Sequence, residues 1–536
     1  MKTQELSNAV DRDRLFRGIC LALVPTGFSF VLVSNILAQL KTEFILTNAA
    51  VGIIGGSALW GMAVSLLLVG PFLERIGLKN ATILAFSCHL IGVTLFLLGY
   101  PFAGQEFAIW VLIAGAIGFG AGNGFIEMAG NPLVAALYPD KKVLKLNHFH
   151  AFFPGAMIVG GLLGFFMAES GTFIGHWTWQ IGIIYIPILV YGAVVLPQRF
   201  PKTETAEAGI GAGELFRYVL THPLLWGLIF IKMITLSLEM GPSRWIPEVL
   251  QAAGVHGMLV FVWITFVMMI LRVFAEPFVE KLAPTGMLIG ASVLTAIGLY
   301  MFAFIETGMF ALLLAGTVFA AGVAFYFPTM VGLMSERFPK AGSLGIVLLI
   351  GMGFLGSGAS NAIMGDIADG YMPDALDPQQ TVTFLQQVEE RFPEYLQAAE
   401  AAEGDLAAMA ELGYRVENVR NALQRTSVAL EHYRSEGALD GVYTGNALRA
   451  VIETGLPQES ELIAAATSIL RPADNYGGRM AFFWVAPFGL AVALVFLVLF
   501  IYDKRRGGYA AVRLDQVERE EADLGPGQLP KASSHA

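Results

Sequence analysis

A glutamate stands in the middle of a long apolar segment. In "GNGFIEMAGNPLVAALYP" (residues 122–139), Asn123 precedes Glu127 by one helical turn and Asn131 follows it by one turn. Residues four apart lie on one face of a helix, so the three side chains form a single polar stripe. Burial favours the neutral form of a carboxyl group, so such an acid can bind and release a proton. The flanking amides can bind hydroxyl groups, and the pattern predicts a protonatable site for a hydroxylated solute.

A structural interpretation of the same acid stays open. Glu127 could instead be held in a permanent ion pair, with Lys232 or Arg272 as its partner. A proline follows Glu127 in this segment, at Pro132, and another follows Glu239 in a second acidic segment, at Pro242. A proline removes one hydrogen bond of a helix and leaves a main-chain carbonyl free. We therefore expect both helices to be interrupted at these positions.

A second acidic segment is "LSLEMGPSRWIPEVL" (residues 236–250). Glu239 is expected to act in ion coupling or in hydroxyl binding. Trp245 offers a flat face on which a sugar ring can stack; a position in the aromatic belt at the membrane surface is the equal alternative. Arg244 is expected to pair with Glu239 or Glu248 rather than to bind the solute.

Three histidines also fall in apolar segments. His148 and His150 stand where one such segment begins, and we expect them at the membrane interface, with pH gating as the alternative. His89 is alone in its segment and is expected to be a hydrogen-bonded core residue.

The composition indicates a membrane protein. Hydrophobic residues make up 55% of the 536 residues, charged residues only 14%, and the mean hydropathy is +0.63, whereas soluble domains carry about a quarter charged residues. The pI near 5.4 argues against nucleic acid as a partner. The two cysteines, Cys20 and Cys88, lie in apolar runs and predict neither a disulfide framework nor a metal site. We find no nucleophile–base set and no phosphate-binding loop, and therefore expect neither an enzyme nor a cofactor.

Twelve segments are long enough to span a membrane, which takes about 20 mostly apolar residues. Lys and Arg gather on the side of the chain that carries both termini, which predicts cytoplasmic termini in a plasma or inner membrane. The first segment shows no small-residue cleavage site and is expected to remain as an anchor. The predicted spans are 17–39, 48–72, 80–100, 107–137, 149–168, 177–197, 223–249, 256–279, 285–305, 308–334, 342–368 and 479–502.

A polar, glycine-rich break divides these spans into six and six. The expected organisation is an N-terminal bundle (1–197), a cytoplasmic linker (198–222), a C-terminal bundle (223–502) and a cytoplasmic tail (503–536). Residues 370–478 depart from this plan as an insertion between the last two spans. Residues 371–478 hold 17 acidic and 7 basic residues with helical apolar spacing. We expect a helical extracytoplasmic cap; the alternative is a loosely packed insertion with no role in transport.

The loop "GPFLERIGLKN" (70–80) resembles the signature loop of the major facilitator superfamily, which lies between the second and third spans. The resemblance implies an all-α membrane protein with twelve transmembrane helices in two six-helix bundles, and a conformational role for this loop. The stretch "LRVFAEPFVEKLAP" (271–284) resembles this loop more weakly and stands at the equivalent place in the second half. There Arg272 and Glu276 are spaced to pair on one helical face. The residues implied in gating are Gly70, Glu74, Arg75, Gly77, Lys79, Arg272 and Glu276.

Several further stretches together resemble the fucose–galactose–glucose symporter family. They are "FIEMAGNPLVAALYP", "KLNHFHAFFPGAMIVGGLLG" (145–164), "LSLEMGPSRWIPEVL" and "FYFPTMVGL" (325–333). The family's fucose carriers also have an aspartate in the first span. Ser34 stands at the matching position here, with Asn35 beside it, so no carboxylate is available there.

The function implied is proton-coupled uptake of a sugar or similar polyhydroxylated solute by alternating access between the bundles, with Na⁺ as a further possibility for the coupling ion. Glu127 and Glu239 are the predicted coupling acids, and Asn123, Asn131, Asn35 and Trp245 the predicted solute contacts. An uncoupled sugar facilitator and a drug or lipid exporter would use the same scaffold. A membrane-embedded enzyme or solute sensor is a rival from a different class.

Overall fold

Long apolar helices make up most of the structure, a computed structural model that describes residues 10–44, 48–103, 105, 107–402, 416–454, 456, 460–512 and 514. A segment inside hydrocarbon must satisfy its own backbone hydrogen bonds, so apolar runs of this length form helices. Within the described residues, eleven helical segments are long and apolar enough to cross a membrane. The eighth predicted span corresponds to α14 (Gly257–Val273), a shorter apolar helix of 17 residues.

The first half covers the first six predicted spans, of which the first, second and sixth are each built from more than one helical piece. Its elements are α2 (Arg12–Leu21), α3 (Val24–Glu43), α4 (Asn48–Val64), η1 (Ser65–Val69), η2 (Gly70–Phe72), α5 (Leu73–Ile76), α6 (Leu78–Leu98), η3 (Tyr100–Phe102), α7 (Ala108–Leu137), α8 (Lys142–Glu169), η4 (Phe173–Gly175), α9 (Trp177–Gly182) and α10 (Tyr185–Val195).

The second half follows two short linker helices, α11 (Glu204–Glu207) and α12 (Ala212–Thr221). Its further elements, besides α14, are α13 (Pro223–Ala252), α15 (Glu276–Phe304), α16 (Met309–Val323), α17 (Tyr326–Arg337), η5 (Pro339–Ala341), α18 (Gly342–Tyr371), η6 (Met372–Ala375), α19 (Pro378–Ala401), α21 (Val416–Glu436), α22 (Gly441–Ile452) and α23 (Glu461–Arg505).

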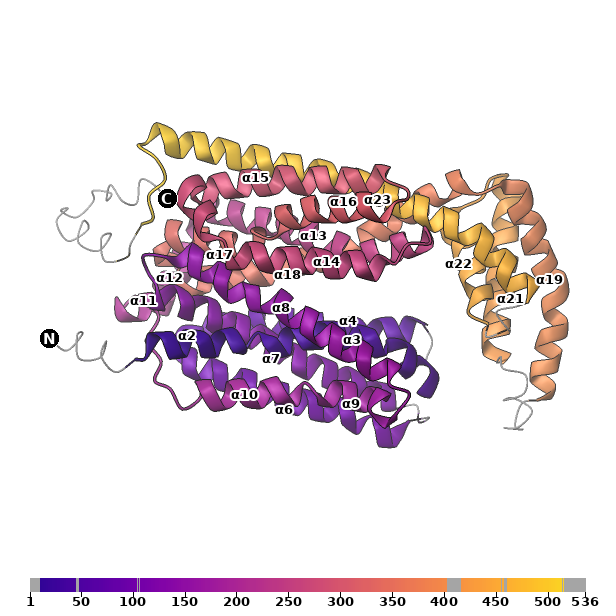
Figure 1. Cartoon of the computed structure of the whole chain (residues 1–536), viewed down its shortest axis with the longest axis horizontal. Helices are drawn as coiled ribbons and strands as arrows, with labels where there is room; N and C mark the ends of the chain where they lie inside the picture. Colours follow the sequence, from indigo (N-terminus) through magenta and orange to yellow (C-terminus); the bar gives the residue numbers. More distant parts are fainter. Residues whose placement is uncertain are drawn as a thin grey trace.

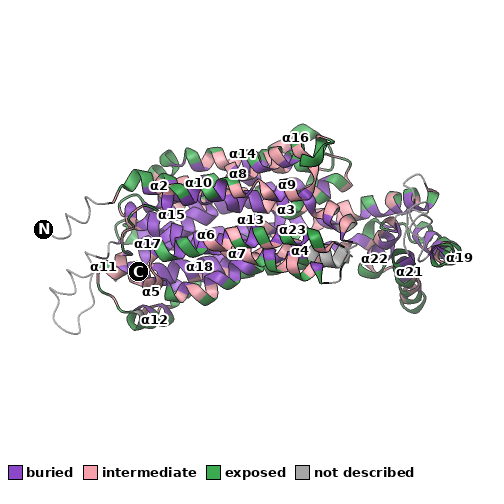
Figure 2. Ribbon diagram, turned by 90° about the horizontal axis from the view of Figure 1, so that it is seen from below, coloured by how far each residue is buried: buried purple, intermediate pink, exposed green. Residues whose placement is uncertain are grey.

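The two halves lie side by side with their long helices aligned (Figure 1). Buried residues fill the interior of both halves, and exposed residues line the outside of the helices (Figure 2). Glycines allow close helix crossings, as between α6 and α7. A Cβ added at Gly92 would lie 2.1 Å from the backbone nitrogen of Phe119, and one added at Gly115 would lie 2.4 Å from that of Phe96. Small residues at such contacts let helix backbones approach, which is how membrane helices commonly pack.

The predicted helix breaks at Pro132 and Pro242 are wrong. The helix α7 continues through Pro132 to Leu137, and α13 continues through both Pro242 and Pro247 to Ala252. A proline removes a single bond from the helix, and packed neighbours in a membrane bundle hold the remaining turns in place. Both acidic segments are therefore presented on continuous helices.

The insertion is helical, as predicted, and lies at the end of the molecule opposite to the two termini (Figure 1). It consists of α19, α21, α22 and the first turns of α23, which share a hydrophobic core of their own that includes Leu385, Val419, Leu448 and Ala466. The last helix, α23, runs unbroken for 45 residues from the insertion into the twelfth predicted span. The predicted boundary at 478/479 between the insertion and the span therefore falls inside one helix.

The insertion is joined to the ends of α18 and α23. Arg449 of α22 donates to Asp369 of α18 at 3.3 Å and to Asp474 of α23 at 2.7 Å. A Cβ added at Gly441, the first residue of α22, would lie 1.7 Å from the carbonyl oxygen of Asp369. These contacts attach the insertion to the second half.

Part of the C-terminal tail also packs on the second half. Asp503, at the end of α23, accepts hydrogen bonds from Arg337 of α17 at 2.6 Å. Tyr509 donates to the carboxylate of Glu336 at 2.5 Å, and the backbone nitrogen of Val512 donates to the Glu336 carbonyl at 2.9 Å. The tail residues after Val512, apart from residue 514, lie outside the described part of the chain.

Candidate functional site

Six ionisable or amide side chains gather where the two halves meet. We call this group the central polar cluster. Its members come from α7, α8, α13 and α14, and each is at most 5% exposed. The cluster consists of Glu127, Asn131, His150, Lys232, Glu239 and Arg272.

Glu127 and Asn131 form the part of the cluster that the sequence predicts. The side-chain amide of Asn131 donates to Oε2 of Glu127 at 2.7 Å, and also to the main-chain carbonyl of Glu127 at 2.8 Å. The spacing of four residues along the unbroken α7 brings the two side chains together, as expected. The predicted stripe therefore holds for these two residues.

His150 extends this pair into a chain of hydrogen bonds. Its Nε2 lies 2.9 Å from Oδ1 of Asn131 and 3.9 Å from Oε2 of Glu127, and its ring lies 4.6 Å from that of Phe327. Because the amide nitrogen of Asn131 donates to the carboxylate, the amide oxygen faces the histidine, so Nε2 is the donor. His150 is only 3% exposed and lies inside the cluster, and its predicted position at the membrane interface stays a prediction.

Arg272 links the cluster across the two halves. Its guanidinium donates to Glu239 at 3.1 Å, to the main-chain carbonyl of Ala324 at 2.7 Å and to that of His150 at 3.2 Å. The predicted pairing with Glu276 is wrong. The helix α14 ends at Val273 and α15 begins at Glu276, so the two residues do not share a helical face, and Glu276 is exposed.

Lys232 is a cluster member that the sequence suggested only as an alternative ion-pair partner. Its Nζ makes no hydrogen bond to a described residue and lies 3.7 Å from the centre of the Phe327 ring. Its charge interacts with those of Glu239 and Glu127. The sequence signal was present, since a lysine in the apolar run of α13 is costly unless it faces polar groups.

Asn123 belongs to a different hydrogen-bond group. Its Oδ1 lies 3.0 Å from Nε2 of His89, and its amide nitrogen donates to Ser29 at 3.2 Å. The other ring nitrogen of His89 lies 3.0 Å from the hydroxyl of Tyr191. All four residues belong to the first half, so His89 is a hydrogen-bonded core residue as predicted, and Asn123 lies outside the cluster.

Two other predicted solute contacts also lie outside the cluster. Asn35 is exposed on α3 and donates to Oε1 of Gln180 at 2.7 Å. Trp245 is half-buried on α13, where a Cβ added at Gly365 of α18 would lie 3.5 Å from its ring. Of the four predicted solute contacts, the structure thus places Asn131 beside Glu127.

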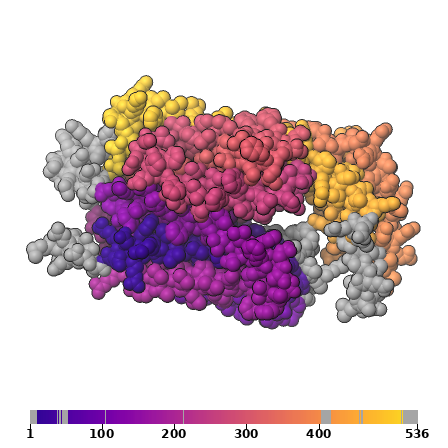
Figure 3. Space-filling model, in the orientation of Figure 1, coloured from indigo at the N-terminus to yellow at the C-terminus, as the bar shows by residue number. Residues whose placement is uncertain are grey.

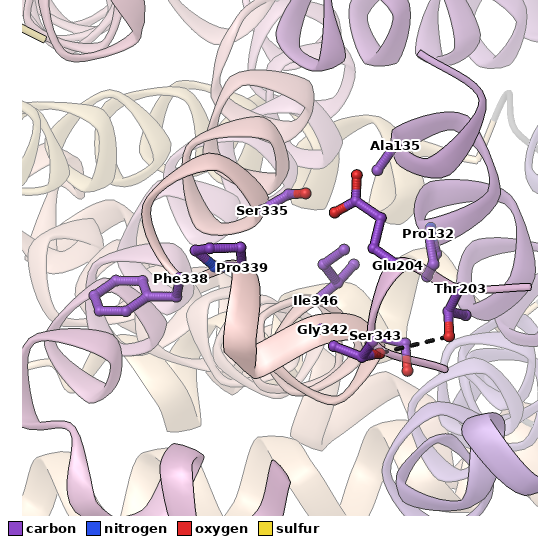
Figure 4. Close-up of a pocket in the computed structure, with 11 residues that line it drawn as sticks. Pro132, Ala135, Thr203, Glu204, Ser335, Phe338, Pro339, Gly342, Ser343 and Ile346 are labelled. Carbon is purple, nitrogen blue, oxygen red and sulfur yellow. Dashed lines mark hydrogen bonds between the residues drawn. The ribbon is translucent and has the colours of Figure 1, made fainter. Parts of the chain in front are cut away.

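The predicted gating loop contacts the linker and the second half. The carboxylate of Glu74 accepts hydrogen bonds from Thr203, from Thr205 at 2.7 Å and from Ser343 at 2.6 Å. Thr203 and Thr205 belong to the linker and Ser343 to the first turn of α18. Figure 4 shows Thr203 and Ser343 around one small pocket between the halves. We call these contacts of Glu74 the linker junction.

Tight packing surrounds the linker junction. A Cβ added at Gly70 would lie 2.1 Å from Cγ1 of Val347 on α18, and Lys142 of α8 donates to Glu204 of the linker at 2.8 Å. Gly77 has a φ of 80°, a backbone conformation that favours glycine. The two basic residues of the loop, Arg75 and Lys79, are exposed.

The halves meet through the helix segments nearest the termini. The contacting elements include α14 and α17 with α8, and the start of α18 with η1 and η2. In Figure 3 the halves touch along the end that carries the termini and separate toward the end that carries the insertion. The central polar cluster lies at this contact.

A family model described as the Major Facilitator Superfamily matches residues 19–372, more than half of the chain. The chain belongs to the Major Facilitator Superfamily. The superfamily predicted from the signature loop is therefore confirmed, and members of this superfamily are transporters. The matched region includes all six residues of the central polar cluster and the linker junction.

Individual relatives are distant. A gentisate transporter from Corynebacterium glutamicum is 23% identical over 241 residues, which cover 42% of this chain and 52% of that protein. The galactose-proton symporter of Escherichia coli K12 is 24% identical over 180 residues, which cover 33% of this chain and 36% of the symporter. The chain thus spans about half or less of the length of these curated relatives.

Two solved superfamily structures share the fold. The proton:xylose symporter XylE bound to 6-bromo-6-deoxy-D-glucose superposes with a TM-score of 0.57 at 17% identity, covering 66% of this chain and 88% of that one. The transporter FucP in the outward conformation gives 0.54 at 18% identity, covering 66% and 92%. At these identities the likeness establishes the fold alone.

Proposed function

We propose that this major facilitator protein is a secondary transporter that couples the inward movement of a proton to the uptake of a small polyhydroxylated solute. The observation that carries the proposal is the hydrogen-bonded series from His150 through Asn131 to Glu127 at the contact between the halves. Glu127 is the proton carrier. Its hydrogen-bond partners belong to the first half and move with it, whereas Lys232 and Arg272 belong to the second half, so the charges around Glu127 change when the second half moves away.

Alternating access supplies the coupling. The halves are packed together on the terminus side, with Arg272 of the second half bonded to the carbonyl of His150 in the first. Rocking the bundles toward the other state breaks this bond and opens Glu127 to the terminus side. A carrier of this kind crosses only with both proton and solute bound or with both absent.

The solute class rests on the amides and on distant relatives. Asn131 is the solute contact that lies beside the proton carrier, and Glu239 is a second acid for coupling or hydroxyl binding. Asn35, Asn123 and Trp245 lie outside the central polar cluster, and their contact with the solute stays a prediction. A galactose-proton symporter is among the similar proteins, which supports a sugar-like solute.

We place both termini in the cytoplasm and the protein in the plasma or inner membrane. Arg75, Lys79 and Lys281 are exposed at the terminus side, as the positive-inside rule requires of a cytoplasmic face. The insertion then lies outside the membrane on the extracytoplasmic side, where it caps the mouth of the second half. The conformation described is closed toward the cytoplasm.

An uncoupled facilitator is the second candidate, and one observation favours it. Ser34 and Asn35 occupy the place in the first span where fucose-type carriers have an acid, and Ser34 donates to the carbonyl of Phe30. Glu127 and Glu239 are the acids that we propose for coupling in the absence of an acid at this position. A facilitator would equilibrate its solute across the membrane without accumulating it.

Transport by the purified protein in proteoliposomes tests both candidates. Radiolabelled sugars are offered with an imposed pH gradient and, separately, with an imposed Na⁺ gradient. The Glu127→Gln variant should lose uphill uptake while solute exchange continues. Glu169→Gln, an exposed acid at the end of α8, is the matched control and should behave as the wild type. Uphill uptake that persists in Glu127→Gln would remove the proposed role.

A further inference from the structure

Lys232 is a buried cation whose hydrogen-bonding capacity is unused. Its side chain is 0% exposed, and Nζ donates no hydrogen bond to a described residue. An ammonium group carries three N–H donors, and a buried charge is normally paired and hydrogen-bonded. The ring face of Phe327 at 3.7 Å offers a cation–π contact but no hydrogen-bond acceptor of ordinary strength.

The two acids of the cluster already have other donors. Glu239 accepts from Arg272 through Oε1, and Glu127 accepts from Asn131 through Oε2. The second oxygen of Glu239, Oε2, is also buried and has no hydrogen-bond partner among the described residues. The cluster therefore holds one unused donor group and one unused acceptor on α13, seven residues apart. A spacing of seven residues is about two helical turns, so both groups lie on the same side of α13.

We propose that Lys232 binds the carboxylate of the transported solute, while Oε2 of Glu239 accepts a hydrogen bond from one of its hydroxyl groups. The solute is then a small hydroxylated monocarboxylate. This inference rests on the proposed function, since it names the solute class of the same site. A carboxylate on Nζ forms a charge-assisted hydrogen bond, the strong kind for a buried lysine. Because Oε2 of Glu239 is an acceptor, its partner on the solute must be a donor, and a hydroxyl group is one.

The net charge moved in each transport cycle differs between a monocarboxylate and a neutral sugar. One monoanion moving with one proton carries no net charge across the membrane, whereas one neutral sugar with one proton carries a charge of +1. Moving one charge through a membrane potential costs or yields energy, about 2.3 kcal/mol per 100 mV. Uptake of the acid is therefore independent of membrane potential, and uptake of a sugar is not.

Proteoliposomes holding the full-length protein test this directly. Uptake driven by an imposed pH gradient is measured for gluconate, a dihydroxybenzoate and glucose, with K⁺ and valinomycin clamping the potential at either sign. We expect one of the two acids to be transported in preference to glucose, at rates that do not change with the potential. Gluconate and dihydroxybenzoate distinguish an aliphatic from an aromatic solute. Preferred uptake of glucose that rises with an inside-negative potential would overturn the inference.

Two variants of Lys232 connect this behaviour to the residue. Lys232→Met should raise the KM for the preferred acid about 10- to 100-fold, the range for loss of a hydrogen bond to a charged group, and Lys232→Arg should recover part of the affinity. Lys145→Met removes a lysine that packs on Tyr138 and Phe16 outside the cluster, and is the matched control. An unchanged KM for the acid in Lys232→Met would overturn the inference.

Counterflow without a proton gradient separates this failure from failure of the proposed function. If Lys232-dependent exchange of the acid persists but a pH gradient drives no uptake, the solute class holds and proton coupling is wrong. If a pH gradient drives glucose uptake with full affinity in Lys232→Met, proton coupling holds and the solute class is wrong.

Discussion

The guanidinium of Arg272 lies 3.1 Å from the carboxylate of Glu239, deep between the two halves of the protein. Both residues are at most 3% exposed. The same guanidinium donates to the carbonyl of His150 in the other half, so one cation holds both an acid of its own half and the backbone of the opposite half. This pair fixes the geometry in which the central polar cluster is closed.

Breaking this ion pair from one side should destabilise the protein strongly. Arg272→Met leaves Glu239 buried without its partner, and loss of one member of a buried pair costs about 3–5 kcal/mol. We expect a clear fall in the thermal unfolding midpoint of the purified protein in detergent. Replacing both residues, as Arg272→Met with Glu239→Leu, should be less harmful than the single change, because neither member of this pair is left buried without the other.

The double variant is the control within this experiment. If the two changes are additive and the double variant is the least stable, Arg272 and Glu239 contribute independently and the pair is not an energetic unit. Transport should be lost in Arg272→Met, in Glu239→Leu and in the double variant, so the unfolding midpoint is the informative readout.

Asn131 should matter for coupling because it connects the proton carrier to His150. Asn131→Ala removes a hydrogen bond to the Glu127 carboxylate, and bonds to charged groups contribute about 1.5–3 kcal/mol. We expect proton-driven uptake, measured as Vmax/KM in proteoliposomes, to fall about tenfold or more. Gln198→Ala is the matched control, since Gln198 is an amide outside the cluster that donates to a helix carbonyl four residues earlier. Equal activity of both variants would argue against a relay through Asn131.

The sequence predicted the fold well because membrane spans depend on local properties. A run of about 20 apolar residues must form a helix in hydrocarbon, so the predicted ranges coincide with helices without knowledge of their packing. The pair of Glu127 and Asn131 was also predictable, since both lie on α7 four residues apart. Interactions within one helix follow from its period.

The remaining members of the cluster depend on contacts between distant segments. His150, Lys232 and Arg272 come from three other helices, and only the packing of the halves brings them to Glu127. The predicted pairing of Arg272 with Glu276 assumed a continuous helix, but the chain leaves the helix at Phe274, between the two residues. The sequence did carry a signal for this break, since Pro277 lies in the first turn of α15 and proline favours the start of a helix over its interior.

The insertion should move with the second half, and Arg449 should hold it there. Arg449→Met removes the bonds to Asp369 and Asp474. Since Arg449 is partly exposed, we expect a modest loss of about 1 kcal/mol. Hydrogen–deuterium exchange in α22 should rise about fivefold as a result, with transport retained.

The matched control for this change is Arg434→Met. Arg434 forms an exposed pair with Glu389 within the insertion, at 3.3 Å, away from the membrane helices. Its loss should leave exchange in α22 unchanged. If both variants raise exchange equally, the ion pairs of Arg449 act as ordinary surface pairs and do not anchor the insertion.

Gly70 should control the balance between the two conformations of the transporter. A Cβ at this position would lie 2.1 Å from Cγ1 of Val347, across the contact that closes the terminus side. Overpacking costs about 1–3 kcal/mol, and this cost falls only on the closed state, because the two residues separate when the halves rock apart. Gly70→Ala should therefore raise the population open at the terminus side about tenfold.

Distances between two spin labels, measured by double electron–electron resonance, report this shift in population. Labels replacing Lys79 and Lys281, exposed at the terminus ends of opposite halves, are introduced after Cys20 and Cys88 are changed to alanine. Gly70→Ala should increase the fraction of long distances. The added change Val347→Ala should reverse the effect, because it removes the methyl group that the new Cβ would overlap.

Gly56→Ala is the matched control for Gly70→Ala, since it lies in the same predicted span and an added Cβ there has no atom within 4 Å. It should leave the distance distribution unchanged. If Gly70→Ala also leaves it unchanged, the contact with Val347 can relax within the closed state. If Val347→Ala fails to reverse the shift, the glycine acts through the backbone of the signature loop instead of through this contact.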